Sequence, residues 1–186
     1  SVEIHAALTP LMSGELQITE MVLRRPFAVV GLDASGRLVW SNDSGPSVPF
    51  APEQVRIDRF EVVDGALDVD DNRAGRTIRL TNVNLGGSAS SLIGPFRAEG
   101  GLVADGRRLT VRLATGRLQE DRGGIRIKLS LLPADAPLSL DLDGTLVRDP
   151  DAVPTFSGIA VLERLPTDDG TMPWRIDGQV AATPEH

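Results

Sequence analysis

The sequence has no cysteine and no tyrosine, and its only histidines are His5 and His186. Without thiols there is no disulfide framework, thiolate nucleophile or cysteine-based zinc site. So few histidines, one of them the final residue, do not provide a Ser-His-acid triad or a histidine metal cluster. The sequence also lacks a G-x-S-x-G nucleophile motif and the glycine-rich loops that bind nucleotide phosphates. We therefore expect a protein that is not an enzyme, with no metal and no cofactor.

Basic residues are too few and too scattered for a polyanionic partner. The net charge is −7 and the pI is near 4.8, and no dense block of Lys and Arg occurs. Nucleic acids and anionic membrane surfaces draw their affinity from such blocks, so neither is an expected partner. Aromatic residues make up only 4% of the chain, which leaves carbohydrate binding as a remote option because sugar-stacking platforms need exposed rings.

No apolar run approaches the roughly 18 residues of a membrane span. The chain starts at Ser1, without a Met or a signal peptide, so it is expected to be a fragment of a larger protein. Any membrane contact is then made by segments absent from this chain. A hydrophobic content of 41% and a mean hydropathy of −0.04 are typical of a folded globular domain.

Alternation of apolar and polar residues runs through the whole chain, whereas helical periodicity is almost absent. It is clear in Leu109–Leu113, Ile125–Leu131, Leu138–Leu142 and Trp174–Ile176, each apolar on one side only. The sequence therefore predicts an all-β fold of about a dozen short strands in an antiparallel meander. We expect the sheet to be strongly curved, U-shaped or a partly open barrel, with an apolar concave face.

Turn residues separate the predicted strands. Two-residue hairpin connections are expected at Asp64-Gly65, Ala74-Gly75, Asp105-Gly106 and Gly123-Gly124. The clusters of breakers at 41–54 and 166–173 predict longer loops. We expect one β-domain over 1–186, with a first hairpin unit at 1–40, a linker loop at 41–54 and the curved sheet at 55–186.

The pattern apolar-x-apolar-x-x-apolar-x-apolar occurs three times, at 16–23, 55–62 and 78–85. One extra residue between two alternating halves is what a β-bulge inserts. Bulges are therefore predicted near Thr19 and Glu20, Asp58 and Arg59, and Thr81 and Asn82. The alternative is that each pattern is two short strands meeting by chance.

Several glycines fall on the apolar register of a predicted strand, where a missing side chain lets a sheet bend without crowding its concave side. Bulges are an alternative for these glycines, and Asp-Gly turns compete at Gly144 and Gly178 in particular. The predicted sheet-bend glycines are Gly100, Gly144, Gly158 and Gly178.

The strands predict one continuous apolar face with no amphipathic helix to cover it. Burial by self-curling, a second sheet, a partner or lipid would each satisfy such a face. Trp174 shares its register and is expected in a core or groove, while Trp40 ends a hairpin strand and is expected to cap this face. The candidate groove residues are Ile78, Leu80, Leu109, Val111, Leu113, Ile125, Ile127, Leu129, Leu138, Leu140, Leu142, Ile176 and Val180.

Carboxylates cluster at three places in the chain. Paired carboxylates can act as acid and base in a glycosidase or bind calcium. Most of these alternate out of phase with the apolar residues or lie in turns, so a solvated, edge-protecting role is expected. The groups are Asp68, Asp70 and Asp71, then Glu120 and Asp121, then Asp141, Asp143 and Asp149.

Residues 14–40 resemble the amino-proximal unit of the AsmA family, in which a Gly-led strand with a central bulge ends in Arg-Pro and a second strand and Gly turn lead to a tryptophan. Val39 departs from the polar residue that the family often has before that tryptophan. Residues 57–101 are similar to the family's following unit. The matching positions in the first unit are Gly14, Leu16, Ile18, Leu23, Pro26, Gly36 and Trp40.

This resemblance implies a periplasmic protein of Gram-negative bacteria, anchored to the inner membrane by an amino-terminal helix outside this chain. The family is similar to bridge-like lipid transfer proteins and is linked to outer-membrane biogenesis and phospholipid transport. The expected partners are phospholipid acyl chains and adjoining strands of the full-length protein. The alternative is a non-catalytic structural or protein-interaction β-sandwich whose own side chains fill its interior.

Overall fold

The computed structural model describes residues 1–32, 38–40, 50–71, 75–118, 124–147, 155–167 and 171–182. Within them the chain is all-β, and its twelve strands form one sheet. The strands are β1 (Val2–Ala7), β2 (Leu16–Arg24), β3 (Phe27–Leu32), β4 (Leu38–Trp40), β5 (Val55–Asp71), β6 (Arg76–Ala89), β7 (Phe96–Ala104), β8 (Arg107–Thr115), β9 (Gly124–Pro133), β10 (Leu138–Val147), β11 (Thr155–Arg164) and β12 (Trp174–Ala182). Two short helical turns are described, α1 (Leu8–Leu11) and η1 (Pro52–Gln54).

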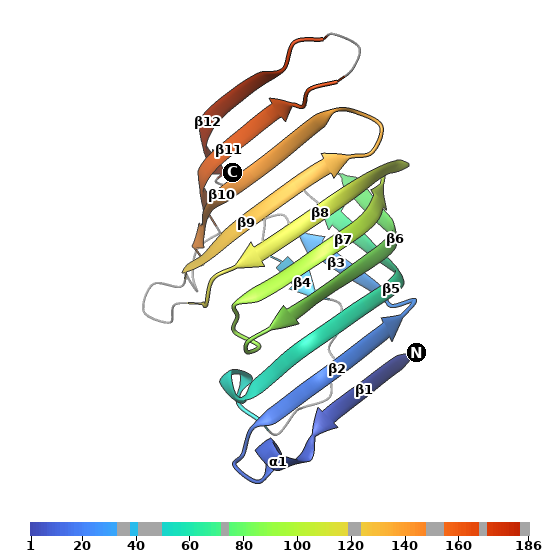
Figure 1. Ribbon diagram of the computed structural model, residues 1–186, viewed down its shortest axis with the longest axis vertical. Helices are drawn as coiled ribbons and strands as arrows, with labels where there is room; N and C mark the ends of the chain where they lie inside the picture. The colour runs from blue at the N-terminus through green and yellow to red at the C-terminus, as the bar shows by residue number, and fades with distance from the viewer. Residues whose placement is uncertain are drawn as a thin grey trace.

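The sheet is open (Figure 1). Its main path runs β1-β2-β5-β6-β7-β8-β9-β10-β11-β12, so β1 and β12 form its two ends. From β5 onward every neighbour along this path is antiparallel, as the turn residues between the strands predict. At about 4.8 Å per strand the path spans about 43 Å. The strands β3 and β4 lie off this path, where β3 pairs with β5 and β4 pairs with β3.

The expectation of antiparallel neighbours is wrong at β5, which pairs in parallel with both β2 and β3. The strands β2 and β3 run one after the other along β5, and the break between them is Arg25-Pro26. Arg25 has a φ of 51°, and its backbone N–H donates to the Val63 carbonyl at 2.8 Å. Parallel pairing requires a long return connection, and the chain between β3 and β5 has that length.

The three predicted bulges are confirmed. The β1–β2 register shifts opposite Thr19, the β5–β6 register shifts between Ile57 and Phe60, and the β6–β7 register shifts between Thr81 and Asn84. In each case one strand carries an extra residue. The apolar positions on both sides of the bulge therefore stay on one face of the sheet.

The predicted hairpin turn at Asp64-Gly65 is wrong, because β5 continues through it as a bulge. Asp64 takes a φ of 53°, a conformation that aspartate tolerates, and its N–H donates to Asn84 Oδ1 at 3.0 Å. Across the ladder Asn82 has a φ of 49°, and Asn84 Nδ2 donates to its carbonyl at 2.9 Å. The Asn84 side chain thus supplies hydrogen bonds that the interrupted ladder lacks, and the sheet bends here.

Beyond this bend an arm folds back from the main sheet. We define the arm as β3, β4, the second half of β5 and the first half of β6. In Figure 1, β3 and β4 lie behind the main sheet. On the arm, Leu67 and Val69 of β5 pair with Leu80 and Ile78 of β6.

The other turn predictions have mixed outcomes. Asp105-Gly106 joins β7 to β8 as a two-residue hairpin, and its φ angles of 48° and 83° fit a type I′ turn. Gly75 lies in the β5–β6 connection, and Gly124 begins β9. Ala74, Gly123 and residues 41–49 and 168–170 of the predicted loops lie outside the described residues. The described remainder of these loops contains no strand and, in 50–54, the short turn η1.

The sealed core is small. The cluster of buried residues comprises Ile18, Val55, Ile57 and Ala89, with Phe60 and Phe96 among the half-buried neighbours packed against it. The loop after β6 closes this end, since Leu92 N–H donates to the Pro52 carbonyl at 2.9 Å. The core therefore sits where the start of β2, the start of β5 and the end of β6 meet.

Gly144 of β10 and Gly158 of β11 lie directly opposite each other. A methyl group on Gly158 would come within 2.5 Å of the Gly144 Cα, and one on Gly144 would come within 2.5 Å of the Phe156 ring. The two backbones therefore approach too closely for any side chain. Gly178, one strand further on, would meet nothing within 4 Å.

We predict that Gly158→Ala lowers the free energy of unfolding by about 1–3 kcal/mol, because the added methyl overpacks the β10–β11 pair. Gly178→Ala is the matched control and is expected to be neutral or to stabilise by up to about 1 kcal/mol. Chemical denaturation followed by circular dichroism measures both. Equal effects at the two positions would contradict the close approach.

Candidate functional site

Cross-strand pairing aligns apolar side chains on one face of the sheet. One row crosses β7 to β11 at a single level, and a second row runs beside it to β12. We call the surface that carries both rows the apolar face. The rows are Ala98, Leu113, Leu129, Leu142 and Ala160, and then Gly100, Val111, Leu131, Leu140, Leu162 and Ile176.

The strand registers place all the candidate groove residues on this same face. Ile78 and Leu80 lie on the arm, and the others lie on β8, β9, β10 and β12. Trp174 shares the face with Ile176, in keeping with its predicted register. The side chain of Trp40 lies outside the described part of the chain. Contact of these residues with lipid stays a prediction.

Among the described residues, no second sheet and no helix longer than one turn covers the apolar face. The solvent-accessible surface is 12657 Å², whereas a compact monomer of this mass exposes about 8600 Å². Large apolar side chains remain exposed at both ends of the sheet, where Ile4 is 57% and Ile176 is 62% exposed. The chain thus exposes far more surface than a compact domain of its mass, and large apolar side chains on the apolar face are part of that surface.

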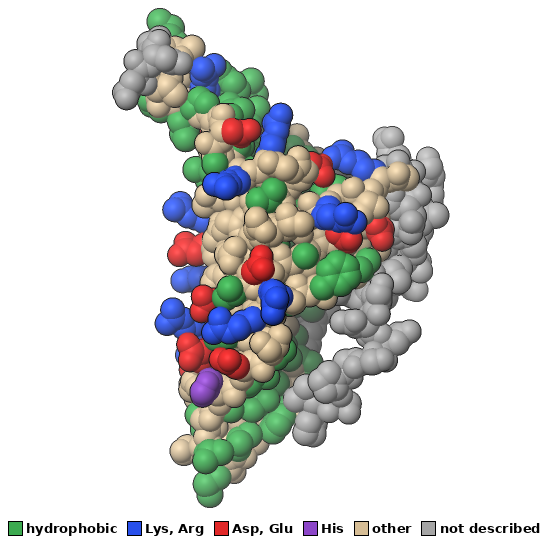
Figure 2. Space-filling model, turned by 90° about the vertical axis from the view of Figure 1, so that its right-hand side faces the viewer, with side chains coloured by type: hydrophobic (Ala, Val, Ile, Leu, Met, Phe, Trp, Pro, Cys, Tyr) green, Lys and Arg blue, Asp and Glu red, His purple; other side chains and the backbone are tan. Residues whose placement is uncertain are grey.

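The opposite face is charged and is held together by ion pairs between neighbouring strands. Asp143 of β10 contacts both Arg126 and Lys128 of β9 at 3.0 Å. Arg175 of β12 pairs with Glu163 of β11 at 2.6 Å. We call this surface the charged face. Charged side chains line the left-hand edge of the molecule in Figure 2, while hydrophobic ones gather at its lower end.

An open hollow of about 1220 Å³ is lined by residues of β5 to β12. The long side chains in its lining belong to the charged face, among them Arg97, Arg112 and Lys128, with Glu99 and Asp143 beside them. Cations and carboxylates alternate across it, so their charges largely balance. Such a surface is suited to contact with water and to fixing the register of neighbouring strands, rather than to binding one anionic ligand.

Comparisons of this chain with protein-family models, with curated proteins and with solved structures give no match. The site therefore rests on its own geometry.

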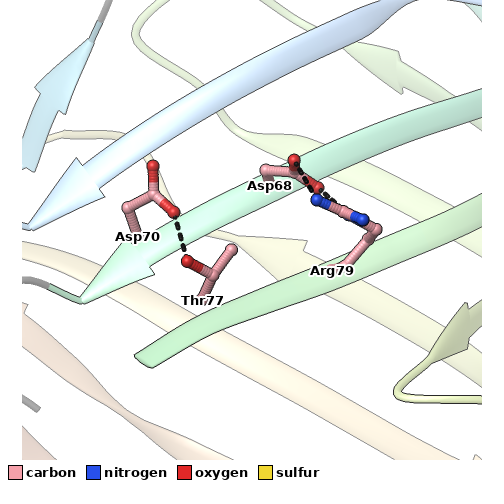
Figure 3. A network of polar contacts seen from close by, with 4 residues as sticks. All are labelled: Asp68, Asp70, Thr77 and Arg79. Atoms are coloured by element: carbon pink, nitrogen blue, oxygen red, sulfur yellow. Dashed lines mark hydrogen bonds and ion pairs between the residues drawn. The ribbon is translucent and has the colours of Figure 1, made fainter. Parts of the chain in front are cut away.

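The predicted carboxylate cluster on β5 is divided among separate polar contacts on the arm (Figure 3). Asp68 accepts two hydrogen bonds from Arg79 on β6, at 2.9 and 3.2 Å. Asp70 accepts a hydrogen bond from Thr77 at 2.7 Å. The side chain of Asp71 is outside the described part of the chain, as are Glu120, Asp121 and Asp149. Asp68 and Asp70 therefore link two strands instead of converging on a ligand.

Within the described ranges, no group of three or more His, Cys, Asp or Glu side chains is placed to hold a metal ion. Neither described helical segment is long and apolar enough to cross a membrane.

The sequence-based selection of groove residues missed several members of the apolar face, including Phe96, Leu131, Phe156 and Leu162. Alternation within their strands carries the signal for each of them. It also missed Arg164, which falls on the apolar register of β11. A charged residue on an apolar register stands out only when the pairing partners are known.

The pKa of Asp143 is held below its usual value by hydrogen bonds from Arg126 and Lys128. The ionised form of Asp143 is therefore favoured in the folded state. The ion pairs make a small contribution to the stability of the fold, which is fully present above the pKa of Asp143 in the unfolded chain. The contribution is lost as the pH falls through the lower folded pKa.

We therefore predict that Arg126→Gln raises the pKa of Asp143 toward its ordinary value, and that Lys128→Gln raises it less. Carboxyl chemical shifts recorded by NMR across an acid titration measure both changes. Arg112→Gln removes a cation that pairs with Glu99 instead, and so serves as the control. An unchanged Asp143 titration in Arg126→Gln would show that the ion pair is not formed.

Proposed function

We propose that the apolar face binds phospholipid acyl chains and that this chain is a segment of a lipid-conducting groove. The observation that carries the proposal is that, apart from the arm, which folds back from the same sheet, no layer of the described residues covers this face. An apolar surface left in water is costly at about 25 cal/mol per Å², so an occupant is expected.

The dimensions of the apolar face suit hydrocarbon tails. Strands of about ten residues, such as β9, β10 and β11, are about 33 Å long. One leaflet of a bilayer core is about 15 Å thick, so an extended acyl chain fits within the width of the sheet. Each methylene removed from water contributes roughly 0.8 kcal/mol, which retains a lipid without a specific contact.

The resemblance to the AsmA family supports a cellular setting for this groove. We propose a periplasmic location, an inner-membrane anchor outside this chain, and a role in outer-membrane biogenesis and phospholipid transport. A groove of this kind needs no catalytic residue, because the protein changes where a lipid lies and leaves its covalent structure unchanged.

The alternative is a sandwich whose interior is filled by its own side chains. Such a fold needs a second sheet packed about 10 Å from the first. Every strand in the described ranges belongs to the same sheet. We therefore favour the groove, and the experiment below separates the two.

We predict that Val111→Asp, Ile127→Asp and Leu140→Asp each lower phospholipid retention by more than about tenfold, because an unpaired carboxylate on the lining is costly to desolvate. Delipidated protein is mixed with phosphatidylethanolamine–phosphatidylglycerol vesicles and re-isolated by gel filtration. The phosphorus that remains with the protein is then measured.

Thr110→Asp is the matched control, since Thr110 is exposed on the opposite face beside Val111. It is expected to retain lipid as the unmodified protein does. Circular dichroism of every variant accompanies the measurement. Full retention in all three apolar-face variants would refute the groove, and their unfolding would favour the sandwich.

A further inference from the structure

Arg164 is a cation on the apolar face. It is the last residue of β11, and the registers align it with Leu138 of β10 and Trp174 of β12. Its neighbour Glu163 lies on the charged face and pairs with Arg175 at 2.6 Å. Of the carboxylates in the described ranges, none forms an ion pair with Arg164.

The Nε atom of Arg164 is buried and has no hydrogen-bond partner. An unsatisfied buried donor typically costs about 1–3 kcal/mol, and more when the group is charged. An anion that approached this guanidinium would satisfy it, because arginine binds phosphate oxygens with two parallel N–H donors. The site therefore has an unused capacity for an anionic oxygen ligand.

The position of Arg164 is where the apolar surface of β11 ends. The residues that precede it on the same face are Leu162, Ala160, Gly158 and Phe156, none of which is charged. From Arg164 to Phe156 the strand extends about 27 Å, and one acyl layer of a bilayer needs about 15 Å. A tail that starts at Arg164 therefore stays on apolar side chains along its whole length.

Trp174 lies directly opposite Arg164 and is 40% exposed. An indole ring has an apolar body and one N–H donor, and tryptophan is enriched where hydrocarbon meets headgroups. An arginine paired with a tryptophan at one rim of the apolar face is thus the combination of residues expected where lipid headgroups meet hydrocarbon.

From this geometry we infer that Arg164 and Trp174 form a headgroup site for the anionic phosphate of an amphipathic lipid whose tails lie along the apolar face. This inference rests on the proposed function and adds the headgroup chemistry and the orientation of the lipid. The phosphate lies at the rim formed by the end of β11 and the start of β12, and the tails run toward Phe156.

The test compares dioleoylphosphatidylglycerol with dioleoylglycerol, which has the same tails and no phosphate. Arg164→Gln is expected to reduce retention of the phospholipid about tenfold and to leave retention of dioleoylglycerol unchanged. Arg108→Gln is the control, because Arg108 is exposed at the same rim on the charged face. It is expected to change neither lipid.

The outcomes separate this inference from the proposed function. If the unmodified protein retains neither lipid, the groove itself fails, and the headgroup site fails with it. If it retains both lipids and Arg164→Gln retains them equally well, the groove stands and the headgroup site is overturned. Binding of inorganic phosphate at Arg164, with equal retention of the two lipids, would identify a free-anion site and also overturn the inference.

Fluorescence gives a second readout that a merely structural arginine would not change. In a Trp40→Phe variant Trp174 is the only tryptophan. Phosphatidylcholine brominated near the headgroup is expected to quench Trp174 more strongly than phosphatidylcholine brominated near the end of the chain. Stronger quenching by the deep bromine would reverse the proposed orientation and so overturn it.

Discussion

The structure depends on one constraint: a single sheet has one apolar and one charged face, and the described residues include no separate second sheet that packs on the apolar one. Backbone pairing from β1 to β12 provides most of the organisation. Cross-strand ion pairs such as Asp143 with Arg126 add register on the charged face. Only the cluster around Ile18, Val55, Ile57 and Ala89 resembles an ordinary core. The remaining apolar face is therefore left available to an occupant from outside the chain.

The bend of the sheet comes from local backbone chemistry. Asp64 and Asn82 take positive φ angles on facing strands, and Asn84 supplies hydrogen bonds that the ladder lacks between them. The arm folds back at this point, so that β3 and β4 lie behind the main sheet. Further along, the Gly144–Gly158 pair lets two backbones approach closely. Curvature and the apolar lining thus arise from different residues of the same strands.

Alternation was sufficient to predict the faces of the sheet, because side chains in a strand point to opposite sides in turn. It placed Val111, Ile127 and Leu140 on a common face, and an extra residue in the pattern located the bulges.

Alternation does not encode which strands pair over a distance. The parallel contacts of β5 with β2 and β3 were therefore missed. Asp64-Gly65 was read as a turn because its dihedral preferences suit a bulge equally well. The significance of Arg164 depended on its partners across the sheet, which the sequence does not reveal.

The central claim is that hydrocarbon from outside the chain occupies the apolar face. Mass spectrometry of an organic extract of the protein, purified from a Gram-negative host without detergent, tests it most directly. The account predicts phospholipid in at least equimolar amount with the protein. A folded, monomeric protein whose extract contains no lipid would contradict it.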